Sequence, residues 1–126
     1  MTDLSIAAIA VGGGLGSVAR FLVAREMERC LGNFLPYGTL VVNVLGSLAL
    51  GWLATVFLDS PEINIALRLG IAVGFLGAFT TFSAFSFDSV QFLLSGEVWQ
   101  AFLNGAVNTG VCLGMCYLGM QLARLG

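Results

Sequence analysis

Length, composition and charge place this chain in a membrane. Of its 126 residues, 58% are hydrophobic and only 10% are charged, which is too apolar for a soluble domain of this size. At about 20 residues for each helical span, the length allows about four spans, so residues 1–126 are predicted to form one transmembrane domain. The net charge of −2 and the lack of an arginine cluster exclude nucleic-acid binding. Histidine is absent, and neither paired carboxylates nor a phosphate-binding loop is present, so an enzyme is not expected.

Four apolar stretches follow one another along the chain and predict an all-α integral membrane protein. They cover residues 4–23, 39–58, 67–94 and 99–122. The first has no basic leader, so it is predicted to be a retained span rather than a cleaved signal peptide. The polar residues 25–36 predict a loop with a short interfacial helix. Asp59, Ser60 and Pro61 end the second stretch, and Trp99 is predicted to anchor the fourth at the membrane interface.

Small residues recur four positions apart in every span and predict close helix packing, because apolar burial does not drive association in lipid. The pairs are Gly12 with Gly16, Ser47 with Gly51, Gly70 with Gly74, and Gly110 with Gly114. Most of these pairs are expected to serve packing within the chain. The rest are available to a dimer interface.

The arginines are nearly balanced between the two ends of the predicted bundle. One end holds Arg20, Arg25 and Arg29, and the other holds Arg68, Arg124 and the terminal amine. Because arginines in short loops set orientation, two interpretations stay open. Either one arginine decides a single topology, or copies insert both ways up and pair as an antiparallel homodimer.

Between residues 74 and 86, the third apolar stretch has a composition that is unusual for a lipid-facing helix. Two glycines and two consecutive threonines weaken the helix at mid-membrane, and backbone groups released there must face protein or a polar cavity. Carbonyls released around residues 77–80 suit a hard cation such as sodium. The positive ring edges of Phe82 and Phe85 suit an anion, although an aromatic stripe is more commonly core packing.

Polar residues of the other spans are further candidates. Asn43 is the only amide or charged residue between positions 37 and 58, and its two N–H donors are predicted either to hold a desolvated anion or to join helices. Arg20 either snorkels to the interface or forms a positive vestibule, and Asp88 either pairs with it or lies at the other mouth. One face of the fourth span carries Asn104, Asn108, Cys112 and Cys116.

Three motifs together resemble the CrcB/Fluc family of fluoride channels over essentially the whole chain. They are GGGLGSVAR at residues 12–20, GTLVVN at residues 38–43 and GFLGAFTTFSAFS at residues 74–86. The resemblance implies a dual-topology antiparallel homodimer in the inner (plasma) membrane, with a broken third helix and two fluoride pores lined by both chains. It also implies one structural sodium ion (Na+) at the dimer interface, held by the backbone carbonyls of Gly77 and Thr80 of each chain.

The expected pore combines this resemblance with the polar residues above. Its candidate lining is Asn43, Phe82, Phe85, Thr39, Ser83, Ser86, Asn108 and Cys112, with Arg20 at a vestibule. Fluoride is expected to cross in single file and to leave the cytoplasm passively. It can enter the pore because hydrogen-bond donors along the route replace its water of hydration. The chain departs from the family at Ala84, Cys112 and Cys116, where hydroxyls are usual, and at Asn104 and Asn108.

Two other functions fit a short four-span chain. A small multidrug-resistance-type antiporter relies on a membrane-embedded glutamate in its first span, but no acid lies between Leu4 and Arg25 here. A non-conducting helper subunit would not explain a hydroxyl-lined break in the third span. A passive fluoride channel is therefore the prediction from the sequence.

Overall fold

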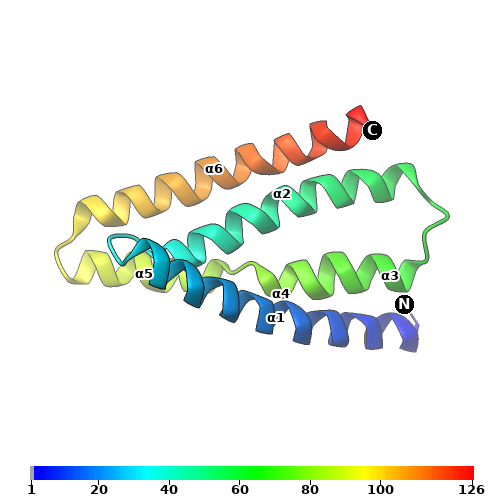
Figure 1. Ribbon diagram of the computed structural model, residues 1–126, viewed down its shortest axis with the longest axis horizontal. Helices are drawn as coiled ribbons and strands as arrows, with labels where there is room; N and C mark the ends of the chain where they lie inside the picture. The colour runs from blue at the N-terminus through cyan, green and yellow to red at the C-terminus, as the bar shows by residue number, and fades with distance from the viewer. Residues whose placement is uncertain (1) are drawn as a thin grey trace.

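The chain folds as helices throughout the part that this computed structural model describes, residues 2–126, and no strand occurs there. Four segments of that part are long and apolar enough to cross a membrane. They are α1 (Asp3–Leu31), α2 (Tyr37–Asp59), the third span (Ile65–Leu94) and α6 (Val98–Leu125). The four run along one axis in alternating directions, so the start of α1 and the end of α6 lie at the same end of the molecule (Figure 1). The predicted four-span, all-helical membrane protein is confirmed.

The first helix is longer than predicted. α1 continues through residues 25–31, where the sequence predicted a loop with a short interfacial helix, and its C-cap is Gly32 with a φ of 87°. In this extension the side chains of Glu26 and Arg29, one turn apart, form an ion pair with an N–O distance of 2.6 Å. Such pairs support a helix in water, so the polar residues prolong α1 beyond the apolar segment instead of ending it.

Two packed pairs build the bundle. α2 lies mainly against α6, and α1 lies against the first half of the third span (Figure 1). A Cβ added at Gly16 would overlap the backbone of Phe75, and one at Gly51 would overlap the backbone of Cys116. Close approach at these glycines therefore needs the missing side chain, as expected for helices packed in lipid.

The third span consists of four segments with two extended residues among them. The segments are α3 (Ile65–Leu69), the π-helical η1 (Gly70–Leu76), α4 (Gly77–Phe79) and α5 (Phe82–Leu94). Thr80 and Thr81 have ψ angles of 159° and 120°, respectively, whereas Gly77 keeps helical angles. Thr81 is the N-cap of α5, and its Oγ1 accepts a hydrogen bond from the backbone N of Ala84 at 3.1 Å. The helical ladder is therefore interrupted at the β-branched threonines rather than at the glycines.

Candidate functional site

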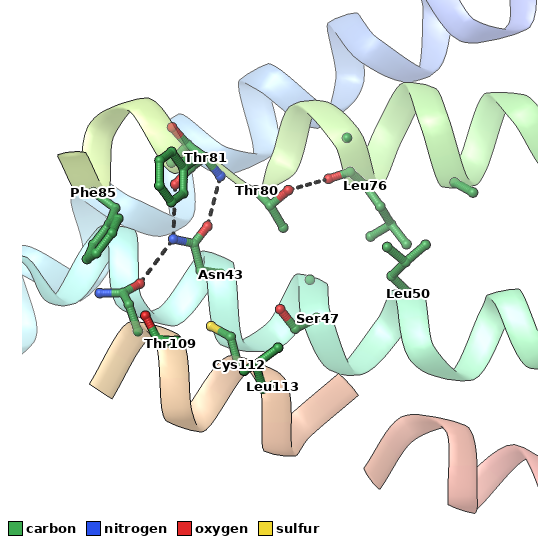
Figure 2. Close-up of a pocket in the computed structure, with 15 residues that line it drawn as sticks. Asn43, Ser47, Leu50, Leu76, Thr80, Thr81, Phe85, Thr109, Cys112 and Leu113 are labelled. Carbon is green, nitrogen blue, oxygen red and sulfur yellow. Dashed lines mark hydrogen bonds between the residues drawn. The ribbon is translucent and has the colours of Figure 1, made fainter. Parts of the chain in front are cut away.

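A cavity of about 400 Å³ opens beside Thr80 and Thr81. Its walls come from α2, both sides of the extended residues and α6 (Figure 2). The polar lining comprises Asn43 and Ser47 of α2, Thr80 and Thr81 of the third span, and Asn108, Thr109 and Cys112 of α6. Three spans far apart in the sequence thus bring amides, hydroxyls and a thiol to one site inside the bundle.

Both the oxygen and the nitrogen of the Asn43 side-chain amide bond to the backbone of Thr81. Its Oδ1 accepts from the backbone N of Thr81 at 2.8 Å, and its Nδ2 donates to the backbone O of Thr81 at 3.0 Å (Figure 2). Nδ2 also donates to Oδ1 of Asn108 at 3.1 Å. Because an amide nitrogen carries two hydrogens, these two bonds engage both N–H donors of Asn43. Of its two predicted roles, Asn43 performs in this structure the one that joins helices.

Arg20 reaches the third span from α1. Its Nε donates to the backbone O of Ala78 at 3.0 Å, so the guanidinium joins α1 to the third span. No ion pair joins Arg20 to Asp88 within residues 2–126, and Asp88 instead accepts from Oγ1 of Thr39 at 3.4 Å. Arg20 and Thr39 line a second cavity, of about 380 Å³, which Thr81 also lines.

The interruption releases backbone groups that lipid cannot satisfy. The side chains of Arg20 and Asn43 bond to two of these carbonyls, those of Ala78 and Thr81. In the described part of the chain, the carbonyl oxygens of Gly77 and Thr80 accept no hydrogen bond across the interruption. These two oxygens remain available, and carbonyl oxygen is a ligand that hard cations prefer.

The predicted phenylalanines lie together at the cavity. The ring centroids of Phe82 and Phe85 are 5.4 Å apart, and their planes are inclined by 59°. Both rings line the cavity, and Phe82 is 78% exposed in the single chain. A tilted pair presents ring edges as well as faces, and the edges carry the positive end of the ring quadrupole.

The structure separates the predicted site residues into three groups. One group lines the first cavity: Asn43, Phe82, Phe85, Asn108 and Cys112, together with Gly77 and Thr80. Thr39 and Arg20 line the second cavity. Ser83 and Ser86 line neither of the two, since Oγ of Ser83 lies 3.2 Å from Oγ1 of Thr81 and Oγ of Ser86 donates to the backbone O of Phe82 at 3.0 Å. Both hydroxyls contact nearby groups of their own span in the single chain, and the place of the two serines in the pore stays a prediction.

Three polar residues that line the first cavity were missing from the predicted site: Ser47, Thr81 and Thr109. Ser47 lies one turn after Asn43 on the same face of α2, and this spacing was a signal that could have identified it. The sequence pattern indicated Thr81 only as a residue that weakens the helix. No sequence pattern distinguishes Thr109, which follows Asn108, as a residue that lines the cavity. Figure 2 shows Ser47 next to Cys112, so a hydroxyl and a thiol meet where α2 faces α6.

These features define a small multi-pass membrane protein in which three spans bring polar side chains to one cavity, the class that includes channels and transporters. Residues 7–120 match the sequence profile of the family described as CrcB-like protein, Camphor Resistance (CrcB). The chain belongs to the CrcB family, which confirms the resemblance carried by the three motifs.

Similar proteins cover nearly the same length. Three are described as fluoride-specific ion channel FluC. The one from Hydrogenovibrio crunogenus is 42% identical over 96% of this chain and 92% of its own. Those from Shewanella halifaxensis and Geobacter sulfurreducens are 44% and 41% identical, over 90% and 95% of this chain and 91% and 97% of their own, respectively.

Proposed function

We propose that this protein is a fluoride-selective channel through which fluoride leaves the cytoplasm passively. The observation that carries the proposal is a cavity at the interrupted third span with amides, hydroxyls and a thiol in its wall, in a chain similar over most of its length to proteins named fluoride-specific ion channels. A multi-pass helical protein of this kind resides in the inner membrane of bacteria. An antiporter of the small multidrug-resistance type is not favoured, because the membrane-embedded acid it needs is absent from α1 between Leu4 and Arg25.

The cavity offers the donors that a strongly hydrated anion needs in place of water. Because the N–H groups of Asn43 are engaged, these donors are the hydroxyls of Ser47 and Thr109, the thiol of Cys112 and the ring edges of Phe82 and Phe85. α5 begins directly after the interruption, and the N-terminal end of a helix carries a partial positive charge that favours an anion.

Fluoride efflux from proteoliposomes tests the proposed function. We expect the parent protein to release fluoride and to retain chloride. Phe82→Ile should lower fluoride efflux about tenfold, because an aliphatic side chain has no positive ring edge to offer the ion. Phe87→Ile is the matched control, since Phe87 is an exposed residue of the same helix that lines neither cavity, and it should leave efflux unchanged. Equal passage of chloride, or no passage of fluoride, would exclude the proposed function.

We further propose that two chains pair as an antiparallel homodimer with two pores. Gly110 and Gly114 of α6 have no neighbouring atom where a Cβ would stand, and Phe82 is largely exposed, so the single chain leaves part of the site open. Arg20 bonds within the bundle, which leaves Arg25 and Arg29 at one end against Arg68 and Arg124 at the other. Equal numbers of arginines give no preferred orientation.

Cysteine labelling tests the dual topology directly. Cys30 is exposed near the end of α1, and Cys112 and Cys116 can be removed as Cys112→Ser and Cys116→Ser. In right-side-out membrane vesicles, a membrane-impermeant maleimide should label about half of the Cys30 thiols, because balanced chains insert both ways. Detergent should then expose the remainder. Labelling of all or none of the thiols before detergent would show a single orientation.

We also propose that a sodium ion is held at the dimer interface by the backbone carbonyls of Gly77 and Thr80 from each chain. Two observations support this sodium site. Among the described residues, the carbonyls of Gly77 and Thr80 accept no hydrogen bond across the interruption, and Gly77 is exposed in the single chain. The ion supplies positive charge that compensates these oxygens in a region without water.

A further inference from the structure

Two buried amides of α6 lie next to the cavity, and both N–H donors of the amide that lines it, Asn108, are engaged. Asn104 and Asn108 are one turn apart and only 1% and 6% exposed, respectively. Asn104 lines neither cavity, although Asn108 lines the first. Buried amides in a membrane bundle require partners, and no buried side-chain nitrogen or oxygen of residues 2–126 lacks one.

These amides belong to a chain of side-chain hydrogen bonds, the amide chain, in which every bond runs in the same direction from donor to acceptor. Nδ2 of Asn43 donates to Oδ1 of Asn108 at 3.1 Å, and Nδ2 of Asn108 donates to Oδ1 of Asn104 at 2.9 Å and to its backbone O at 3.1 Å. Nδ2 of Asn104 donates to Oγ of Ser89 in α5 at 2.9 Å. Each amide thus accepts from the previous one and donates to the next, from Thr81 to Ser89.

The direction of these hydrogen bonds agrees with the orientation of the Asn43 amide that the backbone N–H and C=O of Thr81 require. Oδ1 of Asn43 accepts from the backbone N–H of Thr81, and Nδ2 donates both to the backbone O of Thr81 and to Oδ1 of Asn108 on α6. If Asn108 turned its amide over, Nδ2 would face Nδ2, and the two donors would repel. Asn108 is held in its orientation by two acceptors on Asn104, and hydrogen bonds in such a chain polarise and strengthen one another.

We propose that Asn108 and Asn104 are positioning residues that stabilise the observed orientation of Asn43 and thereby help to hold Thr81 extended at the wall of the cavity. Their amides do not bind the ion; they act on the pore through Asn43. Asn108 has the larger effect, because loss of the Asn104 side chain still leaves Asn108 its bond to the backbone O of residue 104. The expected effect on flux rests on the proposed channel function, whereas the effect on Thr81 does not.

The backbone amide of Thr81 is the readout, measured by hydrogen exchange in NMR spectra of the full-length protein. Asn108→Leu keeps the branching and the number of side-chain heavy atoms but removes the acceptor, so exchange of the Thr81 amide should accelerate about fivefold or more. Asn104→Leu should accelerate it less. Asn108→Asp should stay closer to the parent rate than Asn108→Leu, because a buried, protonated carboxyl group still accepts from Asn43 and can donate to the backbone O of Asn104.

Thr55→Val is the matched control for general loosening of the α2–α6 contact. Thr55 is buried on α2, and its hydroxyl donates to the backbone O of Gly51 at 2.9 Å, outside the chain of amides. Thr55→Val should leave hydrogen exchange of the Thr81 backbone amide unchanged. Equal acceleration in Thr55→Val, or unchanged exchange in Asn108→Leu, would overturn the proposal.

Fluoride efflux from the same variants links the amide chain to transport. Asn104→Leu, which alters no residue lining either cavity, should still reduce efflux. If the parent protein conducts and Asn104→Leu conducts equally well, the positioning role is wrong while the channel function stands. If the parent does not conduct, the channel function fails, and Thr81 exchange still decides whether the amide chain holds the extended residues.

Discussion

Asn43→Asp is expected to reduce fluoride efflux at least about hundredfold. The carboxylate can still accept from the backbone N of Thr81, but it cannot donate to the backbone O of Thr81 or to Oδ1 of Asn108, so both acceptors lose their partner. A negative charge also appears in the wall of the cavity. Between like charges about 4 Å apart, repulsion at an effective dielectric constant of about 20 is on the order of 4 kcal/mol, and about 1.4 kcal/mol already slows passage tenfold.

The same chemical change elsewhere in the chain provides the control. Asn64 is the exposed N-cap of α3, where its Oδ1 accepts from the backbone N of Ala66 at 2.7 Å. Aspartate is an equally good N-cap, so Asn64→Asp should conduct like the parent. Efflux is measured with a fluoride electrode in proteoliposomes that contain equal amounts of each protein. Parent-like efflux from a well-folded Asn43→Asp protein would contradict the role of Asn43 in the pore.

Removal of sodium is expected to abolish fluoride efflux and to lower the thermal stability of the protein. Without a cation, the carbonyls of Gly77 and Thr80 from both chains lack a partner in lipid, and each unsatisfied carbonyl is unfavourable by about 1–3 kcal/mol. A ligand present at about 100 times its Kd stabilises the folded state by about 2.7 kcal/mol, so the midpoint of thermal unfolding should fall measurably.

The experiment compares sodium with N-methylglucamine at constant ionic strength, from purification onward, and follows both efflux and unfolding temperature. Returning sodium should restore both, whereas potassium serves as a control for a larger cation of the same charge. Full efflux and unchanged stability in protein shown by elemental analysis to contain no sodium would exclude the proposed ion. Loss of stability with efflux intact would show a sodium site that the pore does not need.

Hydropathy and motif spacing identified the spans because the membrane imposes a simple length and composition requirement on each helix. All four predicted stretches lie within observed spans, and Asn104 and Asn108, predicted to share one face of α6, are both buried. The polar end of α1 was harder to predict. Its continuation to Leu31 depends on contacts between side chains, such as that of Glu26 with Arg29, that hydropathy does not register.

The sequence alone determined the membrane class, the family and the place along the chain where the third span changes character. Those properties depend on composition and local residue order. Only the tertiary structure decided what the polar residues do there, because Asn43, Arg20 and Asn108 find their partners on other spans. An amide whose two N–H donors are both hydrogen-bonded to protein joins helices, whereas an amide with free donors can bind an ion. For Asn43 the first role results from partners as far as 65 positions away along the chain.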